Sequence, residues 1–188
     1  MFARTDRLTL RPAWPEDAAE LAAAIGHDTV TSMLSRVPSP YTLADAEDFC
    51  ARGHAPDEAR FLILSHDLTW PDGTPAIVGG IALMDLGGPD MEIGYWLTPA
   101  AWGRGYATEA GRAVVAMARH ALGLRRIAGW HFADNPTSGA VLRKLGFRPT
   151  GQNVAKPSLG RSEAAPSIGY TLDLDAAEED QPALRIAA

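Results

Sequence analysis

The spacing of apolar positions along the chain predicts a mixed α/β domain. Polar–apolar alternation or short apolar runs predict strands at residues 7–12, 61–64, 76–84, 91–97, 126–133, 147–153 and 167–174. Three- and four-residue spacing with capping residues predicts helices at 15–25, 27–36, 44–52, 107–121 and 136–145. Hairpin-length loops and one intervening helix predict an antiparallel meander followed by a parallel crossover. We therefore expect a mostly antiparallel sheet of about six to seven strands, flanked by helices.

The most informative stretch is residues 91–121, where a strand, a Gly-rich turn and an Ala-rich helix follow one another. The turn reads Trp102-Gly103-Arg104-Gly105-Tyr106-Ala107-Thr108. The first N–H groups of a helix have no partner within it, and the helix dipole favours negative charge there. The glycines allow a ligand to approach the backbone closely. The stretch therefore predicts a phosphate site, with an ordinary helix-opening turn as the alternative.

The two commonest phosphate motifs do not fit this turn. A Walker loop would end in Gly-Lys-Ser/Thr, which is missing, and Thr108 stands where a dinucleotide fingerprint has its third glycine. The sequence alone thus predicts an anion site on a helix N-terminus without naming the anion.

Composition narrows the classes of function. The net charge of −6 argues against a general nucleic-acid binder. Cys50 is the single cysteine, and the histidines at 27, 54, 66 and 120 show no ligand spacing, so we expect neither a disulfide nor a metal. No apolar run approaches the roughly 20 residues of a membrane span, and no secretory signal is evident at the start. We expect a cytoplasmic protein that associates with no membrane.

Three segments in order resemble the GCN5-related N-acetyltransferase (GNAT) superfamily, and specifically its RimJ/RimL-type branch. They read LTLRP (8–12), EIGYWLTPAAWGRGYATEA (92–110) and NPTSGAVLRKLGF (135–147). The resemblance covers most of residues 5–174 and implies one GNAT-type domain at 1–175, with a flexible tail at 176–188. It also implies a sheet splayed between Met91–Leu97 and Arg126–Ala133, with acetyl-CoA as cosubstrate.

The resemblance implies where the cosubstrate binds. Main-chain groups of Leu97 and Thr98 would hold the pantetheine arm. The pyrophosphate would lie on the turn amides, contributed by Gly103, Arg104, Gly105, Tyr106, Ala107 and Thr108. Arg104 would add a guanidinium, unless it is an ordinary surface arginine. Asn135 is an N-cap from its own sequence context, since Pro136 follows it, and the resemblance adds a contact with the pantetheine arm.

Two residues are candidates for the chemistry. Glu92 interrupts an apolar strand and would act as general base; a paired strand-edge glutamate is the alternative. Ser138 would protonate the leaving thiolate by resemblance, or it simply bonds to the backbone at a helix start. Many superfamily members place a tyrosine acid at the position of Leu142, so that mechanism is missing here. His131 is a second, weaker candidate base.

Strand alternation places Glu92 and Trp96 on one face of their strand and Tyr95 on the other. Tyr95, Trp96 and Trp130 are expected to form core and cleft wall. The resemblance implies acetyl transfer to a primary amine, with a protein N-terminus as one acceptor. A small amine, such as an amino acid, polyamine or antibiotic, is the alternative, and a non-catalytic acyl-CoA binding module is a third. The oligomeric state is left open.

Overall fold

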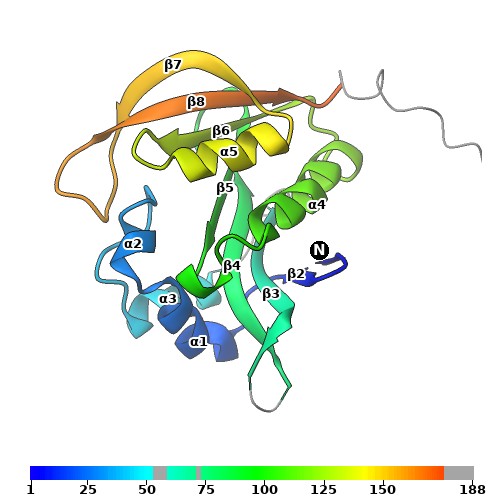
Figure 1. Ribbon diagram of the computed structural model, residues 1–188, viewed down its shortest axis with the longest axis vertical. Coiled ribbons are helices and arrows are strands. Elements are labelled where there is room, and N and C mark those ends of the chain that lie inside the picture. Colours follow the sequence, from blue (N-terminus) through cyan, green and yellow to red (C-terminus); the bar gives the residue numbers. More distant parts are fainter. Residues whose placement is uncertain (53–58, 71–72, 176–188) are drawn as a thin grey trace, which may run out of the picture.

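The computed structural model describes residues 1–52, 59–70 and 73–175. One sheet contains eight strands in the order β1-β2-β3-β4-β5-β6-β8-β7 (Figure 1). The strands are β1 (Ala3–Arg4), β2 (Leu8–Arg11), β3 (Ala59–Thr69), β4 (Pro75–Met84), β5 (Met91–Leu97), β6 (Arg126–Phe132), β7 (Arg148–Lys156) and β8 (Ala165–Asp173). The helices are η1 (Pro15–Asp17), α1 (Ala18–Ile25), α2 (Asp28–Thr31), α3 (Leu43–Ala51), η2 (Pro99–Ala101), α4 (Tyr106–His120) and α5 (Pro136–Lys144).

The sheet has the predicted mixed topology. The β3, β4 and β5 strands form the antiparallel meander, and β5 pairs with β6 in parallel across the α4 crossover. The remaining pairs are antiparallel, so the mostly antiparallel α/β fold is confirmed. A β-bulge lies at Val78, next to the two glycines of β4, since Ile63 faces Gly79 while Leu64 faces Ile77.

Each face of the sheet has its own apolar core. One core packs the sheet against α4 and α5, with Val114 and Leu142 fully buried from the helix side. The other core packs α1 and α3 against the opposite face, through Leu21 and Ala46. Figure 1 shows α4 and α5 together and α1 to α3 apart from them. The two helical layers therefore lie on opposite sides of any opening in the sheet.

The N-terminal helices begin at residues that satisfy their free backbone groups. Thr42 accepts from the N–H of Asp45 while Asp45 accepts from the N–H of Thr42, which makes a reciprocal cap. Before α1, the buried Asp17 carboxylate accepts two hydrogen bonds, of 2.6 and 2.7 Å, from the Arg11 guanidinium. Burial would raise the pKa of Asp17, but the bonds from Arg11 and the Trp14 N–H outweigh it and lower that pKa.

Some predicted boundaries were wrong. The helix expected at 27–36 is only the four residues of α2, because Ser32 onward turns towards the β7–β8 loop, where Arg161 donates to the Ser32 carbonyl at 2.6 Å. Strand β3 extends well beyond 61–64, and the short β1 was missed. The tail expected at 176–188 lies outside the described residues. Within the described ranges, no helix is long and apolar enough to span a membrane.

Candidate active site

The sheet opens between its two central strands. Strands β5 and β6 are paired at Met91, Glu92 and Ile93, and the pairing ends at Ile93 opposite Gly129. Beyond this point β5 stays with β4 as far as Leu97, and β6 stays with β8 as far as Phe132. The splay expected from the resemblance is therefore present, with its apex beside Ile93.

The Gly-rich turn leads from the open end of β5 into α4. Gly103 and Gly105 have φ angles of +75° and +81°, in the left-handed region that favours glycine. Gly105 is the N-cap of α4. Because glycine has no side chain, the first N–H groups of α4 receive no hydrogen bond from an N-cap side chain. Arg104 is exposed between the two glycines. The geometry is that of the predicted anion site.

Three hydrogen bonds fix the segment between the end of β5 and this turn. The Trp102 indole N–H donates to the Leu97 carbonyl at 2.9 Å. The Thr98 N–H donates to the Val78 carbonyl, and the Thr98 carbonyl accepts from Ala101, each at 2.9 Å. A pantetheine arm would therefore meet the main chain of Thr98 only at the second lone pair of its carbonyl.

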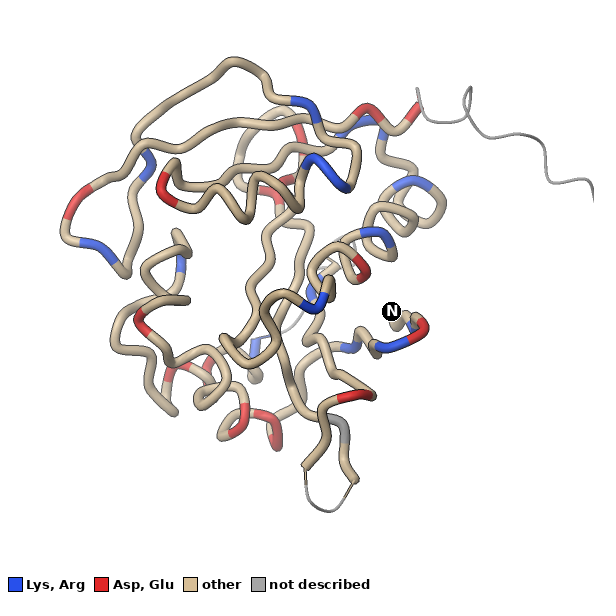
Figure 2. The backbone as a smooth tube through the Cα atoms, viewed as in Figure 1, with Lys and Arg blue, Asp and Glu red and all other residues tan. Residues whose placement is uncertain are grey.

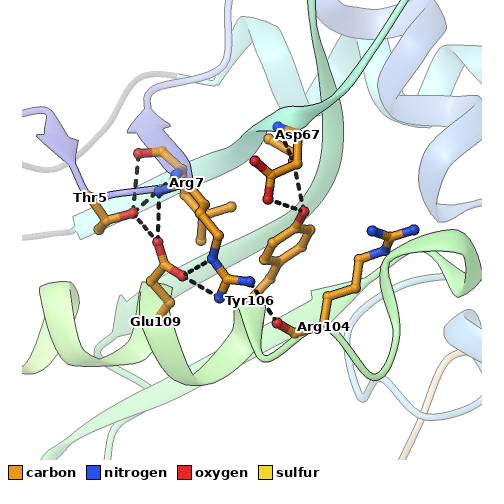
Figure 3. Close-up of polar contacts among 8 residues, drawn as sticks. Thr5, Arg7, Asp67, Arg104, Tyr106 and Glu109 are labelled. Atoms are coloured by element: carbon orange, nitrogen blue, oxygen red, sulfur yellow. Dashed lines mark hydrogen bonds and ion pairs between the residues drawn. The ribbon is translucent and has the colours of Figure 1, made fainter.

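Contacts with β3 hold the first turn of α4 in place. Tyr106 is fully buried, and its hydroxyl donates to Asp67 at 3.0 Å and lies 3.1 Å from the Ser65 hydroxyl. Ala107 and Thr108 are also buried. Figure 3 shows Tyr106 between Asp67 and the side chain of Arg7, which comes from the N-terminal segment. Of the six predicted turn residues, the last three therefore present only main-chain groups to a ligand.

On the α4–α5 face of the splay, two hydroxyls meet. The Tyr95 hydroxyl lies 2.9 Å from the Ser138 hydroxyl and 2.8 Å from the Ser138 carbonyl oxygen. Burial raises the pKa of Tyr95 to about 12, against a smaller lowering by Ser138, so Tyr95 keeps its proton at neutral pH. Tyr95 was expected to be cleft wall, and its place beside Ser138 was not foreseen.

The start of α5 matches its prediction. Asn135 is the N-cap, and its side-chain oxygen accepts from the Ser138 N–H at 3.2 Å. The Ser138 hydroxyl takes no part in that cap. Leu142, at the position of the family's tyrosine acid, is 1% exposed and belongs to the core. Ser138 and Tyr95 are thus the hydroxyls that this structure brings to the splay from α5 and β5.

On the opposite face, the Glu92 carboxylate is half-buried and paired. Its oxygen lies 3.2 Å from the ammonium of Lys156, at the end of β7. The same ammonium lies 3.9 Å from the centroid of the Trp130 ring. Glu92 faces Ala128 in the last paired segment, so Trp130 follows on the same face, just past the apex. Glu92 and the Trp130 ring together surround a primary ammonium, which here belongs to the chain itself.

His131 lies elsewhere. It is buried, with its ring 5.5 Å from that of Tyr170 and its Nδ1 atom 2.7 Å from the Phe132 carbonyl oxygen. Alternation places it on the α5 face, where Gly139 packs against the ring so closely that a Cβ there would lie 2.5 Å from Nε2. His131 and Glu92 are therefore on opposite faces of the sheet. Across the described residues, no group of three or more His, Cys, Asp or Glu could hold a metal.

Comparison with known proteins identifies the family. The sequence matches the acetyltransferase (GNAT) domain over residues 7–148, which is most of the chain. The chain belongs to the GNAT acetyltransferase family. It is 32% identical over 152 residues to the uncharacterized N-acetyltransferase YoaA of Bacillus subtilis, covering 78% of this chain and 82% of the relative.

Solved GNAT structures share the fold. The Microcin C7 self immunity acetyltransferase MccE, in complex with acetyl-CoA and AMP, matches with a TM-score of 0.73 at 18% identity, over 90% of this chain and 93% of MccE. The spermidine N-acetyltransferase of Vibrio cholerae, in complex with CoA and spermine, matches with a TM-score of 0.73 at 16% identity, over 91% and 98%. At these levels of sequence identity, the two structures show that the fold is shared and no more.

Proposed function

We propose that this GNAT acetyltransferase moves the acetyl group of acetyl-CoA directly onto a primary amine at the apex of the β5–β6 splay. The observation that carries the proposal is the division of polar groups between the two faces of that apex. Ser138 and Tyr95 lie on the face of α4 and the Gly-rich turn before it, whereas Glu92 and Trp130 lie on the other. A donor and an acceptor entering from opposite faces would meet between these pairs.

The donor enters from the α4 face. Its pyrophosphate lies on the amides of residues 103–108, its pantetheine arm follows the open edge of β5 past Leu97 and Thr98, and Asn135 lines the other side. Acetyl-CoA bound to the MccE structure, which has the same fold, supports this cosubstrate. The amides at a helix N-terminus suit a pyrophosphate whatever the rest of the molecule is.

The chemical step needs one base and one acid. Glu92, directly or through water, takes the proton of the acceptor ammonium, and the free amine attacks the thioester carbonyl. Main-chain N–H groups at the splay stabilise the oxyanion. As the new C–N bond forms, the nitrogen releases its second proton to water, and Glu92 passes the first one to solvent. As the C–S bond breaks, Ser138 gives its proton to the CoA thiolate and recovers one from solvent, so the products are the amide, the CoA thiol and one net proton. No acyl-enzyme is formed, and Cys50 is buried on α3, away from this step.

Tyr95 controls where the Ser138 proton points. Its hydroxyl has one hydrogen and two neighbours on Ser138, the carbonyl oxygen and the side-chain oxygen. While Tyr95 donates to the carbonyl, the serine proton points at Tyr95. When Tyr95 donates to the serine oxygen instead, the serine proton is free to reach the thiolate. The structure holds both partners at hydrogen-bond distance, which supports this relay.

The acceptor is a cation that can replace the Lys156 ammonium beside Glu92. Acidic residues on α1 to α3, on the acceptor side, favour a positively charged molecule (Figure 2). The RimJ/RimL resemblance favours the N-terminal amine of a protein. A polyamine is the second candidate, because the Vibrio cholerae structure of the same fold is a spermidine N-acetyltransferase.

The test is CoA-thiol release from acetyl-CoA across a panel of amines, with acetyl-CoA binding titrated in parallel. The panel contains peptides with Ala, Ser or Met N-termini, free amino acids, spermidine and an aminoglycoside. We expect release with one class, peptides first. Release with spermidine alone would move the assignment to polyamines. Tight acetyl-CoA binding without release from any amine would contradict amine acetylation and favour a binding module.

A further inference from the structure

Several polar contacts join the N-terminal residues 5–7 to the Gly-rich turn at 103–105 and to the first turn of α4 (Figure 3). Glu109 lies in the first turn of α4 and is 18% exposed. Its carboxylate accepts from the Thr5 hydroxyl at 2.6 Å, from the Arg7 backbone N–H at 3.0 Å and from the Arg7 Nε at 2.8 Å. A fourth bond comes from an Arg7 terminal nitrogen. Both oxygens of this carboxylate thus face one short segment, 102 to 104 residues away along the chain.

Arg7 contacts the Gly-rich turn as well as the helix. Its other terminal nitrogen donates to the Arg104 carbonyl oxygen at 3.0 Å, and the guanidinium lies 4.9 Å from the centroid of the Tyr106 ring. A Cβ at Gly105 would lie 3.7 Å from the guanidinium. A planar guanidinium can fix two acceptors in one geometry, which a lysine cannot. Arg7 therefore sets the Arg104 peptide relative to the first turn of α4.

The orientation of that peptide matters for the ligand. With its carbonyl held by Arg7, the peptide that joins Arg104 to Gly105 directs its N–H to the opposite side, because the two groups of a trans peptide point in opposite directions. The glycines on both sides of Arg104 have positive φ. Because glycine favours no single backbone conformation, the conformation of this turn depends on contacts with other parts of the chain. The contacts of Arg7 supply such a constraint.

We propose that Arg7 and Glu109 are positioning residues for the CoA pyrophosphate, which hold the 103–105 turn in the form that aims its amides at the phosphates. The inference rests on the proposed function, since it takes acetyl-CoA as the ligand of the turn. Neither residue needs to touch the ligand for this role.

Charge alone predicts the opposite effect for Glu109. A carboxylate in the first turn of α4 repels a phosphate at the same helix end, so removing its charge should strengthen anion binding if only charge counted. Burial would raise the pKa of Glu109, but the bonds from Thr5 and Arg7 prevail and lower it, so the carboxylate is charged at neutral pH. The hydrogen bond to Glu109 in turn raises the pKa of Arg7. The sign of the effect of Glu109→Gln therefore separates positioning from charge.

The experiment is a calorimetric titration of acetyl-CoA into the wild type, Glu109→Gln and Arg7→Lys, each checked by its melting temperature. We expect the Kd for acetyl-CoA to rise about tenfold in both variants, through lost preorganisation of the turn. Inorganic pyrophosphate should compete with acetyl-CoA for this turn, and its own Kd should rise by the same factor in both variants. Asp90→Asn is the matched control, because the Asp90–Arg126 pair, at 2.8 Å and 17% exposed at its carboxylate, lies at the far end of β5.

The outcomes separate this inference from the proposed function. A wild type that does not bind acetyl-CoA would overturn the proposed function. A wild type that binds it, with Glu109→Gln binding equally well or more tightly, would overturn the positioning role alone. If Glu109→Gln does not fold, Arg7→Lys decides: it keeps the charge and loses the two-acceptor geometry, so an unchanged Kd there overturns the role as well. If Asp90→Asn raises the Kd for acetyl-CoA as much as the other variants do, the rise reflects general destabilisation of the protein, and the positioning role is overturned.

Discussion

Ser138→Ala is expected to lower kcat by about 10²-fold, or about 2.7 kcal/mol of transition-state stabilisation, without changing the Kd for acetyl-CoA. The loss lies at the low end of the range for an acid catalyst, because a thiolate leaves readily even without a proton. The variant should fold normally, since the α5 cap uses the Ser138 backbone N–H and the Asn135 side chain. Steady-state rates of CoA-thiol release with the best amine of the panel give kcat, and calorimetry gives Kd.

Tyr95→Phe supplies the internal control for this prediction. It removes the hydroxyl that lies 2.9 Å from the Ser138 hydroxyl and keeps the ring in its packing. If the two hydroxyls act as one relay, the double variant is slower than the wild type by much less than the product of the two single effects. Ser138→Ala with wild-type kcat would remove Ser138 from the mechanism. Fully multiplicative effects would remove the relay and leave Ser138 acting without Tyr95.

Glu92→Gln is expected to lower kcat/KM for the amine by about 10²-fold near neutral pH, because a glutamine cannot accept the proton of the acceptor. The deficit should shrink as the pH rises towards the pKa of the amine, about 8 for a peptide N-terminus, since the amine then arrives already deprotonated. Acetyl-CoA affinity should be unchanged. A pH series of kcat/KM for wild type and variant tests both statements.

Lys156→Met is the matched variant, with an effect of the opposite sign. It keeps the aliphatic stem against Trp130 and removes the ammonium that lies 3.2 Å from Glu92. A competing cation is thereby lost, so the KM for the amine should fall severalfold. A higher KM would mean that Lys156 helps to bind the acceptor. Wild-type kcat/KM in Glu92→Gln at every pH would exclude Glu92 as the base.

The sequence predicted the backbone of the Gly-rich turn and of α4 well, because these elements are local. The turn at 102–108, its two glycines and the helix after it are adjacent in sequence, and their chemistry follows from backbone geometry. The cap at Asn135 was likewise predicted from its local pattern, and it is confirmed. The crossover of α4 placed β6 parallel to β5, as the connection rule requires.

The partners of the site residues could not be predicted, because they come from distant parts of the chain. Lys156 was expected in a loop, yet β7 extends to it and brings it to Glu92, 64 residues earlier. Tyr95 and Ser138 meet only because α5 packs on the same face as Tyr95. Arg7 and Glu109 carry no local signal for their pairing. Alternation along β5 did predict the face of each residue, and the cores confirm it, with Trp96 on one side and Tyr95 on the other.

The proposed acetyl-CoA site at the start of α4 is tested most directly by two glycines of similar geometry. Gly103 and Gly123 lie beyond opposite ends of α4, with φ angles of +75° and +63°, and at each an added Cβ would contact nothing within 4 Å. Replacing either by alanine therefore imposes a similar backbone strain, of about 1–2 kcal/mol.

The measurement is the Kd for acetyl-CoA in the wild type, Gly103→Ala and Gly123→Ala, titrated side by side. Only Gly103 lies where the pyrophosphate approaches the backbone, so we predict a Kd at least about tenfold higher in Gly103→Ala and a wild-type Kd in Gly123→Ala. Equal Kd values in all three proteins, or no binding to the wild type, would contradict an acetyl-CoA site on this turn.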